Sequence, residues 1–184
     1  MPSTVAKPKK TTLRPCGGMV VYHGGTEVVA KPEIRTRLRM PDFGTGFYTT
    51  SSEEQAVRWA KHVRLIRGES SAVVTSYDVS GFHAGELVVK KFESVTEEWF
   101  DAVIACRGGN DVFTGFDVVI GPVANDNVYQ TIRFFETGVY SKDEAMRRLL
   151  AERLFNQVSF KTAASLDCLK YISHAVVEDA GGAE

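Results

Sequence analysis

The stretch D-F-G-T-G-F-Y-T-T, residues 42–50, places two glycines directly before an aromatic pair. It is not followed by G-K-S/T, which excludes the phosphate loop of nucleotide triphosphatases, and it lacks the third glycine of a dinucleotide-binding fingerprint. The stretch leads into a β-rich run and does not open a helix. It therefore predicts a turn that enters a short strand, on which Phe47 and Tyr48 point to opposite faces.

A helix is predicted directly after this strand. Ser51 and Glu54 have the spacing of a capping box, and Gly68 is suited to end the helix. The apolar residues between them recur at helical spacing and predict one inward face, formed by Ala56, Trp59, Ala60, Val63 and Ile66.

The remaining segments mix strands and helices without regular βαβ alternation, and this favours an α+β fold. Strands are predicted at 20–22, 72–79, 86–92, 116–122, 155–161 and 171–177, and helices from 96, at 125–135, from 141 and at 163–169. Residues 1–17 are polar and aperiodic, which predicts a flexible N-terminal tail. Residues 18–184 have the length of a single domain.

Composition narrows the class of protein. The chain has 184 residues, 43% of them hydrophobic and 24% charged, with a formal net charge of −1. This near-neutral total excludes bulk electrostatic attraction to nucleic acid or membrane as the main binding force. No segment approaches the roughly 20 apolar residues of a membrane span, and the N-terminus lacks the apolar core of a secretion signal. We therefore expect a cytoplasmic protein without a membrane partner.

The three cysteines, Cys16, Cys106 and Cys168, have no metal-like spacing. Buried thiols in a reducing compartment are the expected state, and no metal is expected. Cys106 is a poor candidate for a nucleophile because the helical register buries at least half of it.

Three segments carry side chains suited to binding a ligand. Tyr22-His23-Gly24 ends the first predicted strand, Tyr48 follows the glycine turn, and Gln157 and Ser159 lie on a late strand. Each is ordinary alone, because a histidine after a strand is usually a surface residue. A glutamine in a strand usually faces solvent in an alternating pattern.

Taken in order, these segments resemble the ADP-ribosyltransferase superfamily, in the branch whose catalytic triad reads His, Tyr, Glu. The resemblance runs from about Val20 to Val177 and is carried by YHGG, DFGTGFYTTSSEEQAVRWA, FDVVIGPVANDNVY and FNQVSFKT. Within that superfamily the chain looks most like a bacterial family of uncharacterised domains, DUF3990. The resemblance implies a split β-sandwich, in which two small packed sheets flanked by helices surround an NAD cleft.

The resemblance also implies roles for single residues. Tyr48 would stack on the nicotinamide ring, adding about 1 kcal/mol of stacking and cation–π attraction. His23 would donate hydrogen bonds to a ribose hydroxyl, and the backbone of Gly24 would hold the carboxamide. The rest of the implied cofactor-binding set is Gly44, Gly46, Phe47 and Ser159, the two glycines letting the loop pass close to the dinucleotide.

The implied activity is mono-ADP-ribosylation of a macromolecule, either protein or nucleic acid, with NAD as co-substrate. The family resemblance suggests a toxin of a toxin–antitoxin or phage-defence system, and hence an antitoxin partner. Hydrolysis of NAD by water is a second enzymatic reading. A non-catalytic NAD- or ADP-ribose-binding module and an interaction protein with a purely structural turn are the alternatives from other classes.

Gln157 departs from the pattern, because active members of this branch carry glutamate at that position. A glutamine can bind a ribose hydroxyl, but it carries no charge and cannot act as a general base. Losing one preorganised electrostatic contact typically costs about 10²–10³ in rate. Three explanations follow: the acceptor needs no polarisation from this site, NAD is bound without turnover, or a carboxylate comes from elsewhere. The candidates for that carboxylate are Asp117, Asp126 and Glu152.

Two further polar groups are weaker candidates for binding. The turn from Arg107 to Asp111 could reach a phosphate, although polar glycine-rich turns are usually only turns. Three arginines form a short basic patch, which is either a solvated face or a contact to the NAD pyrophosphate or to a nucleic acid. They are Arg35, Arg37 and Arg39.

Overall fold

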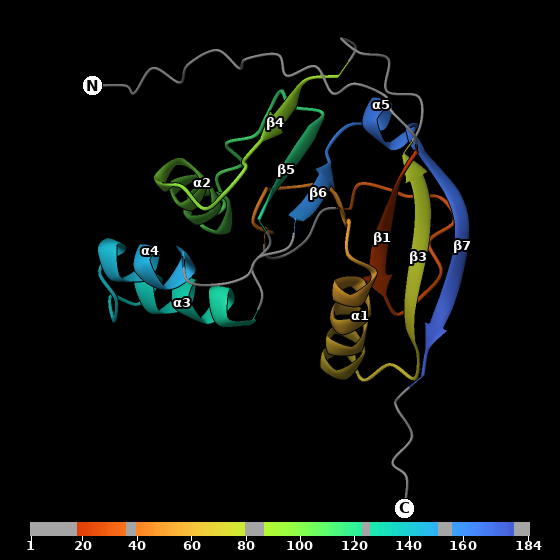
Figure 1. Ribbon diagram of the computed structural model, residues 1–184, viewed down its shortest axis with the longest axis horizontal. Helices are drawn as coiled ribbons and strands as arrows, with labels where there is room; N and C mark the ends of the chain where they lie inside the picture. Colours follow the sequence, from red (N-terminus) through yellow and green to blue (C-terminus); the bar gives the residue numbers. More distant parts are fainter. Residues whose placement is uncertain (1–17, 36–39, 80–86, 123–125, 151–155, 179–184) are drawn as a thin grey trace, which may run out of the picture.

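The computed structural model describes residues 18–35, 40–79, 87–122, 126–150 and 156–178 (Figure 1). Among these, helices and strands mix in the order expected of an α+β fold, so that prediction is confirmed. The strands are β1 Met19–Gly25, β2 Phe47–Thr50, β3 Ala72–Val79, β4 Val89–Lys91, β5 Val118–Pro122, β6 Asn156–Phe160 and β7 Leu169–Val177. The helices are α1 Glu53–Arg67, α2 Glu97–Arg107, α3 Asp126–Glu136, α4 Lys142–Leu150 and α5 Ala163–Leu166. The predicted tail, residues 1–17, lies outside the described residues.

The strands form one mixed sheet in the order β4-β5-β6-β2-β1-β3-β7. β1 pairs with β3 along its whole length, from Met19–Val79 to Gly25–Val73. In contrast, β1 and β2 are joined at a single described pair, Tyr22–Thr50. The expected two packed sheets are thus one continuous sheet, whose two groups of strands meet at this pair. In Figure 1, β1, β3 and β7 run side by side, and β4, β5 and β6 are inclined to them.

α1 begins one residue later than its predicted capping box. Ser52 is the N-cap and accepts a hydrogen bond from the Gln55 amide, which satisfies one of the free amides of the first turn. At the other end Gly68 adopts a left-handed conformation (φ 67°), and its amide bonds back to the last turn, so the predicted end is confirmed.

The predicted inward face of α1 is partly wrong. Ala56 and Ala60 are buried, but 51% of Trp59 and 70% of Ile66 remain exposed. The cause lies in β1, where Gly24 has no Cβ and lets the backbone of α1 come close to the strand at these two alanines. A helix seated this closely meets the sheet along a narrow line of small residues. Its broader apolar stripe therefore stays in solvent.

The described residues form three clusters of buried apolar side chains, and the two larger clusters lie on opposite faces of the sheet. The first is built around α2, α3 and α4 and contains the fully buried Trp99, Phe100 and Ile132, with Phe43 from the turn before β2. The second lies on the other face and includes Phe47, Tyr77 and Phe160. The turn and strand of residues 42–50 therefore contribute aromatic rings to both cores, which fixes their position in the fold.

Some predicted strand ends are moved. The strand expected at 86–92 is only Val89–Lys91, and the last strand begins at Leu169, which shortens the helix before it to Ala163–Leu166. Among the described residues, no helix combines the length and the apolar character that crossing a membrane requires.

Candidate functional site

The three sequence segments singled out for binding lie on neighbouring strands. The sheet order places β6, β2 and β1 side by side, so the regions around Gln157, Tyr48 and His23 adjoin although they are far apart in sequence. The point where β2 meets β1 is also where the two groups of strands separate after the Tyr22–Thr50 pair. This junction is the candidate site.

The three side chains do not share one face of the sheet. Tyr48 lies opposite Ser159, and Thr50 lies opposite Gln157, so these four side chains point the same way. His23 points the other way, because its ring stacks on Phe47 with 4.6 Å between the ring centroids. The structure thus brings Tyr48, Ser159 and Gln157 together and leaves His23 on the opposite side of the junction.

His23 is nevertheless tied directly to β2. Its Nδ1 lies 2.8 Å from the backbone carbonyl oxygen of Tyr48. A carbonyl only accepts, so Nδ1 carries the proton and donates. In the neutral ring Nε2 is consequently the acceptor nitrogen, and it becomes a donor only when the ring is protonated. A neutral His23 would accept a hydrogen bond from a ribose hydroxyl, which reverses the donation expected from the sequence.

Tyr48 has its hydroxyl committed within the chain. The hydroxyl donates to the carbonyl oxygen of Gly44 at 2.6 Å and accepts from the amide of Phe43 at 3.0 Å. The ring packs against the core around α2 but stays partly exposed. Burial raises the pKa of the phenol well above its ordinary range, although Ser159 beside it lowers that pKa. The phenol is therefore neutral at physiological pH and acts as a fixed donor.

Gln157 is buried, with 6% of its surface exposed. Its Nε2 lies 3.5 Å from the carbonyl oxygen of Pro122, a long hydrogen bond to the strand on its other side. Across the sheet it lies between Thr50 of β2 and Gly121 of β5. The position thus offers a neutral, buried amide on strand β6, on the face of the sheet that also carries Tyr48.

Asp117 is not the substitute carboxylate that the sequence left open. It accepts hydrogen bonds from the amide of Val88 at 2.7 Å and from Thr162 Oγ1 at 2.6 Å, so it fixes the start of β5. Its backbone carbonyl accepts a hydrogen bond from the amide of Lys161, which lies at the opposite end of β6 from Gln157. Glu152 and the side chain of Asp126 lie outside what the structure describes.

The predicted glycines are explained by contacts within the chain. A Cβ at Gly24 would meet the carbonyl oxygen of Ala56, and a Cβ at Gly46 would collide with Ser159 Oγ. Gly44 has φ 73°, a conformation that side chains other than glycine rarely adopt. The absence of side chains at these three positions is therefore required by packing and does not by itself indicate a nearby ligand.

Sequence reasoning missed the charged residues that surround the turn before β2. Asp42 pairs with Arg107 at 2.7 Å, and Asp111 pairs with Lys161 at 3.0 Å. The segment from Arg107 to Asp111 thus contacts this turn, a role that replaces the suggested phosphate contact. No spacing rule links these positions, since the partners are 65 and 50 residues apart.

The other sequence candidates are placed as follows. Arg35 pairs with Glu27 and Glu33 on its own exposed loop, which supports the solvated reading of that patch. Arg37 and Arg39 lie outside the described residues. Cys106 and Cys168 are buried thiols, as expected. Within the described ranges no three His, Cys, Asp or Glu side chains form a group that could hold a metal ion.

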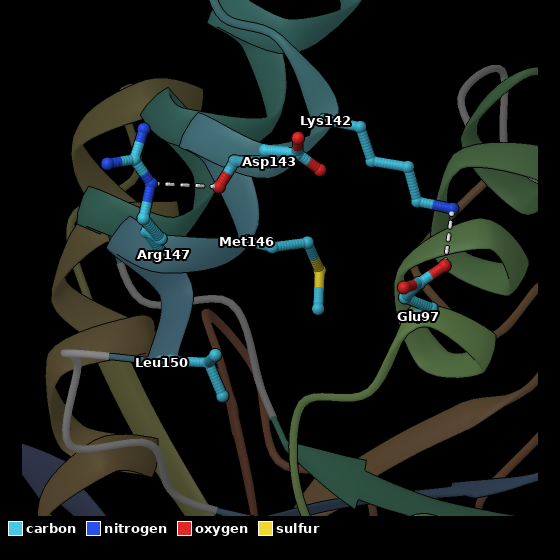
Figure 2. A pocket seen from close by; sticks show the side chains of 6 residues that line it. All are labelled: Glu97, Lys142, Asp143, Met146, Arg147 and Leu150. Carbon is cyan, nitrogen blue, oxygen red and sulfur yellow. Dashed lines mark hydrogen bonds and ion pairs between the residues drawn. The ribbon is translucent and has the colours of Figure 1, made fainter.

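A hollow of about 320 Å³ lies between α2 and α4, away from the junction of β1 and β2 (Figure 2). Figure 2 shows Met146 pointing into it between the two helices, with Lys142 reaching across to Glu97. The other lining residues are Asp143, Arg147 and Leu150. Its charged rim is made of exposed ion pairs and its apolar part is small. The chemistry expected from the sequence is absent from it.

Comparison with known proteins identifies a family. The model of a family described as "Protein of unknown function (DUF3990)" matches residues 19–171, which span every strand and helix up to the start of β7. No curated protein and no solved structure matches the chain.

Proposed function

The chain belongs to the DUF3990 family of proteins of unknown function, and we propose that it is an NAD-dependent mono-ADP-ribosyltransferase that modifies a macromolecule. One observation carries the proposal: the strands bearing His23, Tyr48 and Gln157 are neighbours at the junction where the sheet divides. The resemblance to the His-Tyr-Glu branch requires that adjacency. On this reading, the groups β4-β5-β6-β2 and β1-β3-β7 correspond to the two sheets of a split β-sandwich.

The proposed reaction breaks the bond between nicotinamide and the ribose carbon of NAD. Nicotinamide leaves with the bonding electrons and becomes neutral, while the acceptor adds to the ribose carbon and loses a proton. The transition state resembles an oxocarbenium ion, as in glycoside hydrolysis. The exposed part of the Tyr48 ring would contact nicotinamide, and the amide of Gln157 would bind a ribose hydroxyl. His23 faces the other side of the sheet, so in this proposal it acts through β2, whose Tyr48 carbonyl accepts a hydrogen bond from its Nδ1.

A non-catalytic NAD- or ADP-ribose-binding module is the second candidate. The observation that favours it is the neutral, buried amide of Gln157, which cannot stabilise a developing positive charge as a carboxylate would. The two candidates differ in turnover and share the site. A hydrolase that transfers ADP-ribose to water is a variant of the first.

Labelled NAD incubated with the protein and a cell lysate separates these functions. Label on protein or nucleic acid indicates transfer, free ADP-ribose indicates hydrolysis, and binding without turnover indicates the module. Tyr48→Phe removes the fixed hydroxyl and should lower activity or NAD affinity. Tyr171→Phe is the matched control, because Tyr171 is exposed on β7 and its hydroxyl contacts only His174 in the described structure. Absence of both NAD binding and turnover would reject the proposal.

The biological setting is proposed from the family resemblance. A toxin of a toxin–antitoxin or phage-defence system would act on a protein or nucleic acid of the cell that contains it. It would require an inhibitor protein to restrain it. A small co-transcribed gene beside this one would support the setting, and its protein product should reduce transfer of labelled ADP-ribose.

A further inference from the structure

Two largely buried ion pairs surround the turn that precedes β2. In the pair of Lys161 and Asp111, 5% of the lysine side chain and 20% of the aspartate side chain are exposed. In the pair of Arg107 and Asp42, the exposed fractions are 13% and 12%. Transferring such groups from water into a protein is costly, and apolar residues of similar volume often stabilise a fold equally well. The contacts of the first pair show what the charges provide.

Lys161 uses its ammonium group to hold the backbone of the turn. Nζ donates to the carbonyl oxygens of Phe43 at 2.7 Å and Thr45 at 2.8 Å, and to Asp111 at 3.0 Å. These are three partners for its three N–H groups. An apolar side chain of the same volume could fill this space but could not orient the two carbonyls.

Asp111 holds the same turn from its other side. Its carboxylate accepts from the amide of Thr45 at 3.0 Å and from the amide of Phe113 at 3.0 Å. A Cβ at Gly44 would collide with this carboxylate. The glycine at the tip of the turn thus makes room for Asp111. Both groups of Thr45, its amide and its carbonyl, are held by the pair.

Two other backbone groups of the turn bind Tyr48. The Phe43 amide and the Gly44 carbonyl contact its hydroxyl, and they adjoin the Phe43 carbonyl and the Thr45 amide that Lys161 and Asp111 hold. Lys161 also follows directly after β6, the strand that carries Gln157. The pair therefore connects the turn, the Tyr48 hydroxyl and the end of β6 through charge-assisted hydrogen bonds.

We propose that Lys161 and Asp111 are positioning residues for Tyr48, which fix the turn that receives its hydroxyl and thereby set the affinity for NAD without contacting it. The part of this inference that concerns NAD rests on the proposed function. The part that concerns Tyr48 does not, and it can be measured in the protein alone.

The test uses the double variant Lys161→Met/Asp111→Asn, which removes both charges and leaves neither group unpaired as a buried ion. The matched control is Lys142→Met/Asp101→Asn, which removes an exposed ion pair with the same chemistry on the surface. We expect the double variant to remain folded but to melt below the wild type, because methionine leaves the carbonyls of Phe43 and Thr45 without their donor. The amide of Phe43 should exchange with solvent at least tenfold faster, while amides of β3 keep their wild-type rates. NAD affinity by calorimetry should fall at least tenfold, and the control should change neither quantity.

A thermodynamic cycle with Tyr48→Phe separates positioning from general stabilisation. If the pair acts through the hydroxyl, adding the double variant to Tyr48→Phe should weaken NAD binding less than twofold further. Unchanged exchange at Phe43, wild-type NAD affinity in the double variant, or losses that multiply in the cycle would each overturn the proposal. If the wild type binds no NAD, the proposed function fails together with the claim on affinity. The exchange rates at Phe43 then decide the claim on Tyr48.

Discussion

Replacing Gly24 with alanine should destabilise the protein, because the space beside this residue is filled by α1. A Cβ at Gly24 would lie 2.2 Å from the carbonyl oxygen of Ala56, whereas ordinary contacts begin at 3.4 Å. The helix and the strand would have to separate by about 1.2 Å to restore ordinary contact. The atoms that the Cβ would meet, the Ala56 carbonyl oxygen and the Ala60 nitrogen, belong to the helix backbone, so no side chain can move aside. Overpacking typically costs about 1–3 kcal/mol, and a rigid neighbour favours the upper value. For a chain of this length, about 3 kcal/mol corresponds to a fall in melting temperature of about 6–12 °C.

Gly25 provides the matched control in the same strand. A Cβ there would lie 3.4 Å from His23 Nε2, which is ordinary contact, so Gly25→Ala should change stability by less than about 0.5 kcal/mol. Melting followed by circular dichroism measures both variants. If Gly24→Ala melts with the wild type but loses NAD binding, the glycine serves a ligand and our packing argument is refuted. A fall in melting temperature for Gly24→Ala alone supports the argument.

Three further predictions concern other parts of the structure. Gln157→Glu loses the donor to Pro122 and buries a carboxyl whose folded-state pKa must rise. Urea denaturation at each pH measures the result. The free energy of unfolding of the variant should match that of the wild type below about pH 4, where the carboxyl is protonated, and should fall by about 1–3 kcal/mol as pH rises to 7. Trp59→Ala should change stability little, whereas Trp99→Ala, which empties a fully buried site, should cost about 3–5 kcal/mol; similar losses would contradict the burial. Burial raises the pKa of Cys106 from 9.0 to about 11. As pH rises, the thiol of the unfolded chain therefore loses its proton before that of the folded protein. The free energy of unfolding should accordingly fall between pH 9 and pH 11. Iodoacetamide should accordingly label Cys106 at pH 8 only in urea, and rapid labelling of the folded protein would refute this.

The local features of the fold could be predicted from the sequence. The turn into β2, the strand at 72–79 and the end of α1 at Gly68 depend on residues within a few positions of one another. The failure at Trp59 and Ile66 has a different origin. Helical spacing gives the direction of an apolar stripe, but the width of its contact depends on how closely Gly24 lets the helix approach.

The candidate site shows the same limit. Sequence order suggested that His23, Tyr48 and Gln157 meet, and their strands are indeed neighbours. The faces depend on register, because side chains alternate along a strand and a slip of one residue reverses all of them. The pair Tyr22–Thr50 fixes which residues share a face, and it places His23 on the other face of the sheet from Tyr48. No local pattern specifies that register. The Lys161–Asp111 pair likewise joins segments 50 residues apart, so no local pattern specifies it.

The single Tyr22–Thr50 pair between β1 and β2 has a consequence for how the molecule opens. Long ladders join β1 to β3 and, with one register shift between Ser76 and Tyr77, β3 to β7, whereas β1 and β2 share a single described pair. Each group of strands should behave as a cooperative unit with its own free energy of opening. Native-state hydrogen exchange should then resolve two sets of amides with distinct denaturant dependence, and α1, which is joined to β2 and packed on β1, should exchange with the β1-β3-β7 set.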